Sequence, residues 1–242
     1  VKLVNNVISS SIKRDLNAET LGSASINIAE SLGECYIRIY LVTIQNGIKS
    51  KYPLGTFLIQ TPSYSFDGKI TNVTMDAYTP LLELKENPPP LGYSILKGIN
   101  ILDMAYKLVK ENVRAPVIET KGADKLYNDF VANIDDTWIS FVYDLLANAK
   151  HTLYLDEMGV VSFAPEQDTA SLQPVWTYDD SNSSILYPDL NIDHDLYGIP
   201  NVVEVIYSYG NQCFYGKAIN NDSRSPISIP SRGREITHRV SN

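Results

Sequence analysis

The feature that most constrains the fold is a strand-forming run that ends in a tight-turn dipeptide. Residues 36–44 are Tyr-Ile-Arg-Ile-Tyr-Leu-Val-Thr-Ile, rich in β-branched and aromatic side chains, and Asn46-Gly47 follows. Such a run predicts a strand. Asn-Gly predicts a hairpin, because both residues tolerate the positive φ angles of a type I′ turn. We therefore expect residues 48–52 to fold back on the first strand.

More strands are expected on either side of this hairpin. Residues 23–29 alternate in polarity, and residues 55–61 and 70–79 flank a second turn signal, Asp67-Gly68. The chain also has 16 Tyr, 13 Gly and 13 Pro, a composition that favours strands separated by turns over a helical bundle. Four or five antiparallel strands in so short a stretch predict a barrel or a sandwich, in which closure or stacking hides the strand edges.

The strand pattern stops at Asn87-Pro88-Pro89-Pro90, because consecutive prolines cannot donate to a β-ladder. Two helices are predicted after it, one beginning at Asn100-x-x-Asp103 and one after Asp135-Asp136, with either aspartate as N-cap. A hairpin over residues 153–163 follows. The apolar positions at helical spacing are Leu102, Ala105, Tyr106, Val109 and Val113, then Trp138, Phe141, Val142, Leu145, Leu146 and Ala149.

The last third begins as a polar connector, residues 165–200, rich in Asp, Ser, Asn and Pro. Residues 202–207 and 213–219 then predict another hairpin around Tyr209-Gly210-Asn211. The sequence thus predicts an α+β chain that is mostly β, with three parts: a β domain over residues 1–86, a small α+β module of two helices and a hairpin over 87–165, and a connector with the start of a second β domain over 166–242.

Charge and composition exclude several classes of protein. With 20 Lys and Arg against 28 Asp and Glu the net charge is −8, which disfavours a protein that coats duplex DNA, since phosphate binding needs cations. No apolar run approaches the ~20 residues of a membrane helix, and no secretory signal is expected. Cys35 and Cys213 lack zinc-type spacing and are predicted to be separate thiols in a reducing compartment.

Candidate catalytic groups are few, and we predict no catalytic, cofactor-binding or metal site. Ser10-x-x-Lys13 matches a nucleophile and base spacing without its partner motifs. A polar turn is the favoured interpretation of each acidic group, and a surface position that of each lone histidine. A mobile terminus is favoured for the arginines, with nucleic acid or an acidic partner as the alternative. The groups considered are Asp189, Asp193, His194 and Asp195; Asp135-Asp136 and Asp179-Asp180; His151 and His238; and Arg224, Arg232, Arg234 and Arg239.

One stretch is informative as a string of motifs. Residues 52–59, Tyr-Pro-Leu-Gly-Thr-Phe-Leu-Ile, precede Thr61-Pro62, the Asp67-Gly68 turn, Asp76-Ala77-Tyr78 and Leu81-Leu82. This order resembles phage and prophage tail hub proteins, the baseplate hub or tail-associated family. The resemblance implies tail-tube-like antiparallel β-barrels at residues 1–86 and, in part, after residue 200, with the α+β module outside them.

The resemblance also implies a function, which is structural and not enzymatic. A homotrimer would form a ring at the tail tip of a virion, assembled in the bacterial cytoplasm, that joins the tail tube to the host-attachment apparatus. Its neighbours would be the distal tail protein, the tape measure protein and the tail tube protein. DNA would pass through without specific binding, and no cofactor or membrane insertion is implied. The acidic chain is compatible with a channel that does not retain DNA.

Two other interpretations stay open from the residues alone. A tail-associated cell-wall hydrolase would need a convergent nucleophile, base or metal set, which the sequence does not display. A carbohydrate-binding or adhesion module is compatible with a β domain that exposes Tyr and Trp, because aromatic rings often stack on sugars.

Overall fold

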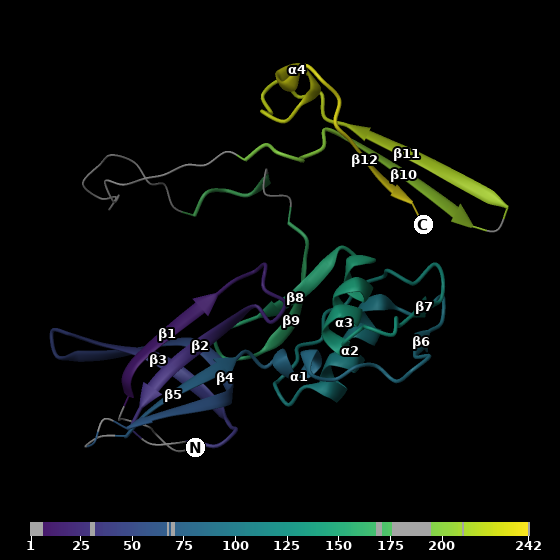
Figure 1. The fold of residues 1–242 in the computed structure, drawn as a ribbon. Coiled ribbons are helices and arrows are strands. Elements are labelled where there is room, and N and C mark those ends of the chain that lie inside the picture. The colour runs from purple at the N-terminus through teal and green to yellow at the C-terminus, as the bar shows by residue number, and fades with distance from the viewer. Residues whose placement is uncertain are drawn as a thin grey trace. The chain divides into compact units, whose positions relative to one another are not determined.

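The structure is a computed structural model that describes residues 7–29, 32–66, 68, 71–167, 171–175, 195–209 and 211–241 (Figure 1). The chain divides into two compact units, Val1–Leu172 and Gln173–Asn242. Strands account for 43% of the structure and helices for 15%, so the predicted mostly β, α+β class is confirmed. No helix among the described residues is long and apolar enough to cross a membrane.

The first unit begins with a five-stranded antiparallel sheet. Its strands are β1 (Val7–Arg14), β2 (Gly22–Ile28), β3 (Tyr36–Gln45), β4 (Ile48–Phe66) and β5 (Thr71–Tyr78), in the order β1-β2-β5-β4-β3. The hairpin predicted at Asn46-Gly47 is confirmed. Both residues have positive φ, 52° and 77°, as a type I′ turn requires.

Two details of this sheet differ from the prediction. Strand β1 was not predicted, and residues 48–52 and 55–61 belong to one long strand, β4. The register of β4 shifts against Ile39–Tyr40 of β3 and again between Ile59 and Thr61, and such bulges let a long strand bend without ending it. Within the described residues β1 and β3 do not pair with each other, so the sheet has two edges and closure into a barrel stays a prediction.

One face of the sheet carries a hydrophobic core and the other is polar. The core follows from strict alternation, as in β2, where every second residue from Gly22 to Ile28 is buried. Its buried residues are Ala24, Ile26, Ile28, Phe57, Ile59, Val73, Met75 and Ala77. The opposite face of β1, β2 and β5 has a shallow hollow lined by side chains that include Ser11, Lys13, Ser23, Ser25 and Asp76.

The α+β module follows in the same unit. It contains α1 (Leu82–Lys85), α2 (Ile101–Asn112), α3 (Trp138–Ala147), the short pair β6 (Ser94–Ile95) and β7 (Phe130–Val131), and the hairpin of β8 (His151–Leu155) and β9 (Val161–Pro165). The two predicted helices and the hairpin are confirmed, and their predicted apolar faces form the core, where Phe141, Leu145 and Leu153 are buried. Helix α1 and the β6–β7 pair were not predicted.

The helix starts show where local signals succeed and fail. The side chain of Asn100 accepts a hydrogen bond from the Asp103 amide at 3.0 Å, so the predicted N-cap of α2 is confirmed. The prediction of Asp135 or Asp136 as N-cap of α3 is wrong. Thr137 is the N-cap and forms a capping box with Ser140, while the Asp136 carboxylate accepts a hydrogen bond from the Asn133 amide in the preceding turn, at 2.7 Å.

Residues 87–93 between the sheet and the module form neither helix nor strand, in agreement with the triple proline. The segment is nevertheless tied to the module, because the carbonyl of Asn87 accepts a hydrogen bond from the Trp138 amide at 2.9 Å. The predicted parts 1–86 and 87–165 both lie within the first unit. Their boundaries, like the one at residue 166, stay predictions.

The second unit contains a three-stranded sheet with the order β11-β10-β12. Strands β10 (Val202–Tyr209) and β11 (Gln212–Ile219) form the predicted hairpin, and β12 (Thr237–Ser241) pairs parallel to β10 after the short helix α4 (Ile229–Arg232). Neither α4 nor β12 was predicted. Whether this sheet is the start of a second barrel stays a prediction.

A single buried asparagine connects the strand ends of the second unit. Asn201 is 3% exposed. Its amide nitrogen donates to the Arg234 carbonyl at 2.9 Å, and its amide oxygen accepts from the Ile236 amide at 2.7 Å. Its own carbonyl accepts from the Asn220 amide at 2.9 Å. Because buried polar groups are costly when unpaired, this network fixes the start of β10 against the segments that follow β11 and precede β12.

Candidate functional site

The candidate groups that the sequence analysis weighed do not come together among the described residues. Ser10 and Lys13 lie three residues apart on strand β1, where side chains alternate between faces, so they point to opposite sides of the sheet. Lys13 instead forms an ion pair with Asp15 at 3.0 Å. His151 contacts the Ala149 carbonyl at 2.6 Å, and His238 is an exposed residue of β12. The structure therefore offers no nucleophile and base pair at these positions.

Only some of the acidic candidates lie within the described residues. The Asp195 carboxylate accepts a hydrogen bond from the Tyr197 amide at 2.9 Å, a local turn contact. Asp179, Asp180, Asp189, Asp193 and His194 lie outside the described residues. Within the described part of the chain no three His, Cys, Asp or Glu side chains gather as a metal site would require. Cys35 and Cys213 are free thiols, as predicted.

The prediction of a mobile basic terminus is wrong for the described residues. Arg232 ends α4 and donates to the carbonyls of Ile199 and Leu196, each at 2.7 Å. Arg239 lies on β12 and pairs with Glu204 of β10 at 2.7 Å. Arg224 forms two hydrogen bonds with the Asp222 carboxylate. These arginines are therefore engaged within their own unit, and we do not assign a nucleic-acid site to them.

The sheet and the α+β module are joined by polar contacts. Arg38 of β3 donates to the Thr56 hydroxyl at 2.9 Å and to the Met158 carbonyl at 2.7 Å. The Thr56 hydroxyl donates in turn to the Glu157 carbonyl at 3.3 Å. The β8–β9 turn thus docks on the β3–β4 ladder. Gly159, with φ of +80°, completes this turn and lies against Thr56.

A second contact of the same kind comes from helix α3. The Tyr143 hydroxyl donates to the Glu19 carbonyl at 3.0 Å. Burial of the phenol, together with the nearby Glu19 charge, raises the pKa of Tyr143 to about 12. Since the folded state favours the neutral phenol, this contribution to stability is complete below pH 10, the ordinary tyrosine pKa, and is lost as the pH rises from 10 to about 12.

Tyr143→Phe tests this pH dependence of stability. Between pH 10 and pH 12 the wild type should lose on the order of 2 kcal/mol through this residue. The variant should lose that much less over the same interval, because it has no phenol to ionise. Urea unfolding at each pH measures the difference. Equal pH slopes for the two proteins would contradict the assignment.

A cleft lies beside this junction, between the start of β3, helix α1 and the end of α2. It has a volume of about 320 Å³ and is lined by Glu34, Leu58, Glu83, Glu86, Asn87, Glu111, Asn112, Val113 and Arg114. The lining includes four glutamates and one arginine, so its formal charge is −3. We call it the acidic cleft.

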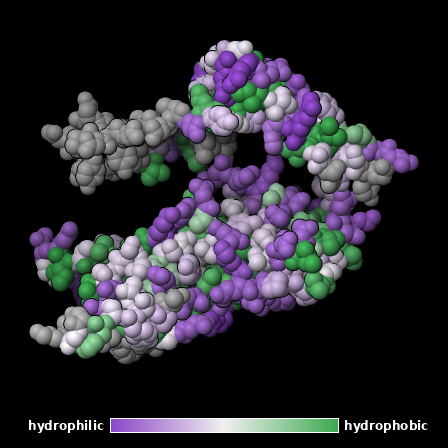
Figure 2. All heavy atoms as spheres, in the orientation of Figure 1, coloured by the Kyte–Doolittle hydropathy of each residue, from purple (hydrophilic) through white to green (hydrophobic). Residues whose placement is uncertain are grey.

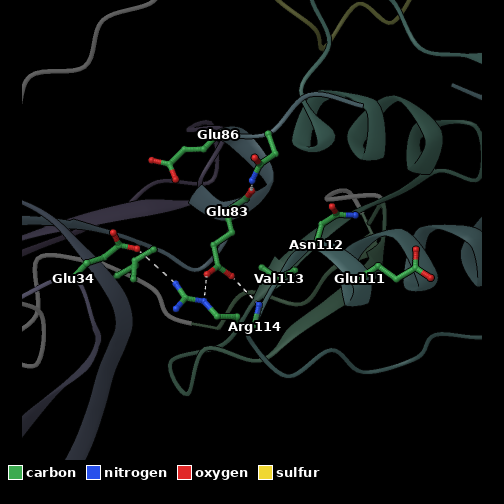
Figure 3. Close-up of a pocket in the computed structure, with 9 residues that line it drawn as sticks. Glu34, Glu83, Glu86, Glu111, Asn112, Val113 and Arg114 are labelled. Carbon is green, nitrogen blue, oxygen red and sulfur yellow. Dashed lines mark hydrogen bonds and ion pairs between the residues drawn. The ribbon is translucent and has the colours of Figure 1, made fainter. Parts of the chain in front are cut away.

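Arg114 lines the acidic cleft and is paired with two of its carboxylates. Its backbone amide donates to Glu83 at 2.7 Å, its guanidinium forms an ion pair with the same carboxylate, and Glu34 lies 3.8 Å away (Figure 3). The guanidinium also stacks 5.0 Å from the Tyr36 ring centroid. Burial and the Glu83 charge raise the pKa of Tyr36, which keeps its phenol neutral. Glu86 and Glu111 are exposed and turn away from Arg114 in Figure 3.

The outer part of the β3–β4 hairpin exposes several apolar residues of the first unit. Residues 40–54 pair only with each other, because β4 meets β5 only from Leu58 onward. Figure 1 shows this ribbon extending beyond the other strands, and we call it the arm. Its exposed apolar residues include Ile44 and Ile48, at 71% and 70%, and Leu41, Val42 and Tyr52.

The sheet of the second unit is also incompletely covered. One face is polar, with Glu204 contacting Arg239, Lys217 and Tyr215. The register places Val205, Phe214 and Val240 on the other face, and these side chains are 44%, 54% and 45% exposed. Both units therefore present apolar strand surface, which in soluble proteins marks interaction sites when it is contiguous.

Sequence reasoning found the strands of the arm but not its exposure. The run at residues 36–44 has the composition of a buried strand, and nothing local indicates that its second half extends past the sheet. The acidic cleft was missed entirely, since its residues come from distant segments. The one available signal was the density of Glu at residues 83–86, at the end of the predicted β domain.

The fold has known counterparts. No family model and no curated protein sequence matches the chain. Among solved structures, a tail protein from Neisseria meningitidis MC58 matches 98% of this chain with a TM-score of 0.63 and 14% identity. The 43 kDa tail protein of prophage MuSo2 from Shewanella oneidensis matches 98% with 0.58 and 12%. The prophage tail protein gp18 from Listeria monocytogenes EGD-e matches 96% with 0.50 and 11%.

These matches extend through both units of the chain. They cover 66%, 68% and 64% of the respective solved structures, so this chain spans about two thirds of their length. The chain therefore has the fold of phage and prophage tail proteins, which confirms the family resemblance inferred from the motifs at the level of the fold.

Proposed function

We propose that this chain is a structural, non-enzymatic component of a phage or prophage tail. The observation that carries the proposal is the fold shared with three tail proteins over 96–98% of the chain. The exposed apolar strand surface of both units supports it, since assembly requires surface that the isolated chain leaves uncovered.

Within the tail, we place the protein at the tip as a baseplate hub. Three copies would form a ring between the tail tube and the host-attachment apparatus, with the distal tail, tape measure and tail tube proteins as neighbours. The hollowed face of β1, β2 and β5 is suited to the channel. Its charged residues are Lys13 and Asp76, and the rest of its lining is mainly hydroxyl-bearing. Such a surface offers passing DNA almost no net charge to bind.

The position in the particle can be tested directly. Antibodies raised against residues 1–172 should label one end of each tail in electron micrographs of particles from the producing strain. Deletion of the gene should remove assembled tails. Label along the whole tube would exclude a hub, and particles without label would exclude a tail component.

The oligomeric state gives a separate prediction. The protein as it is produced with its tail should be trimeric by native mass measurement or mass photometry, because a ring that joins a sixfold tube to threefold tip structures needs three copies with two tube-like domains each. A strictly monomeric species in the assembled particle would contradict the ring.

A further inference from the structure

The arm is a two-stranded ribbon. A two-stranded ribbon is only marginally stable in water by itself, and no third strand pairs with residues 40–54 in the part of the chain that the structure describes. Its outer end carries exposed hydrophobic residues, visible in green on the left of Figure 2. An ordered ribbon with apolar side chains on both faces requires a partner surface.

The two faces of the arm are chemically different. Side chains at Tyr40, Val42 and Ile44 share one face of β3, and the register places Lys51 opposite Val42 and Lys49 opposite Ile44. Lys51 lies 4.0 Å from the Tyr40 ring centroid, which confirms that they share this face. One face of the arm is therefore both apolar and cationic, in a chain whose net charge is −8.

The acidic cleft has the complementary character. Its lining carries a formal charge of −3, while the two apolar residues that line it, Leu58 and Val113, are buried, so the complementarity lies in the charge. Glu83 is neutralised by Arg114, whereas Glu86 and Glu111 are exposed to an incoming cation. Opposite charges of this kind fix the register of a protein contact and suppress wrong partners.

The arm and the acidic cleft lie at opposite ends of the same strand. Glu34 of the cleft immediately precedes β3, and the arm is formed by the far end of β3. Ten residues of strand correspond to about 30 Å. An arm therefore cannot reach the cleft of its own chain. A contact between the two surfaces must therefore be between copies, and when it is head-to-tail it closes into a ring if its rotation permits.

We propose that the apolar and cationic face of the arm docks over the acidic cleft of a second copy of this chain. The inference rests on the proposed ring and names the contact that would build it. Duplex DNA is the other possible occupant of a face with two lysines, but so few cations give only weak, salt-sensitive binding.

Charge reversal tests the contact. Lys49→Glu with Lys51→Glu, or Glu86→Lys with Glu111→Lys, should each weaken self-association roughly tenfold to a hundredfold, because like charges then meet. Combining all four substitutions should restore it. Lys97→Glu with Lys125→Glu, two exposed lysines of the α+β module, is the control for net charge and should leave self-association unchanged. Sedimentation velocity over a wide concentration range measures each variant.

Disulfide trapping gives an independent measurement. In a Cys35→Ser, Cys213→Ser background, Lys49→Cys with Glu86→Cys should form covalent oligomers under mild oxidation. Lys49→Cys with Asp103→Cys, an exposed position on α2, should not. Equal cross-linking in both proteins, or none in either, would overturn the proposal.

The outcomes distinguish the proposed ring from the proposed contact between the arm and the acidic cleft. If the wild type trimerises and either charge-reversal variant trimerises with the same affinity, the ring stands and this contact is overturned. A wild type that stays monomeric both alone and in the particle overturns the ring and the contact together. Loss of duplex DNA binding in Lys49→Glu with Lys51→Glu, with self-association unchanged, would assign the arm to nucleic acid instead.

Discussion

Phe141→Ala is expected to lower the free energy of unfolding of the residue 1–172 unit by about 3–5 kcal/mol, the usual cost of removing a buried phenyl ring. Phe141 is 1% exposed. Its ring contacts Tyr93, Phe130 and Trp138 at centroid distances of 5.6, 4.8 and 6.0 Å. Edge-on and tilted ring pairs add to the energy of burial. The substitution removes the centre of this cluster, which joins α3 to the loop that follows the triple proline.

Urea unfolding followed by circular dichroism measures the loss. Phe66→Ala is the matched control, because Phe66 belongs to the same unit but is 70% exposed. We expect the control to stay within about 0.5 kcal/mol of the wild type, as surface substitutions usually do. Similar losses in both variants would show that the aromatic cluster does not anchor the helix.

Gly159→Ala is expected to cost about 2–5 kcal/mol, from two causes that add. A positive φ of 80° costs a residue with a Cβ about 1–2 kcal/mol. The new Cβ would lie 2.7 Å from the Thr56 Cβ, and overpacking of this kind costs about 1–3 kcal/mol. Thr56 cannot easily move aside, because its hydroxyl accepts a hydrogen bond from Arg38 and donates one to Glu157.

Gly92→Ala separates these two causes. Gly92 has a similar φ of 76°, but nothing lies within 4 Å of the added Cβ. This variant should show only the conformational cost, so the difference between the two variants measures the packing of the β8–β9 turn on the sheet. Thermal unfolding gives both values. Equal losses of stability in the two variants would mean that the turn does not pack against Thr56 in solution.

Some elements could be predicted because their signals are local. Asn46-Gly47 fixes a turn through its own backbone preferences, and the apolar spacing of α3 predicts its buried face without reference to the sheet. Strands β1 and β12 gave no such signal. Every residue of β1 except Ile12 is exposed, and all of β12 is exposed. An alternating pattern arises only where one face is buried, so β1 and β12 lack that signal, whereas β11, exposed along its whole length, was predicted with the help of the adjacent turn residues.

The N-cap of α3 illustrates a different limit. Asp135, Asp136 and Thr137 are all suitable cap residues, and composition alone does not choose among them. Ser140 decides, since it lies at the third helical position only if Thr137 is the cap. The acidic cleft is harder to predict from the sequence than a helix cap. Glu34, Glu83 and Arg114 are brought together only by the docking of the module on the sheet.

The parallel pairing of β12 with β10 has a consequence for the order in which the second unit forms. Strands β10 and β11 are only two residues apart in the sequence, so they can pair locally. Strand β12 can pair with β10 only after residues 220–236 have formed a loop. Closing this loop loses more chain entropy than pairing β10 with β11. Non-local pairings of this kind form slowly. We therefore expect β12 to join the sheet after β10 and β11 have paired.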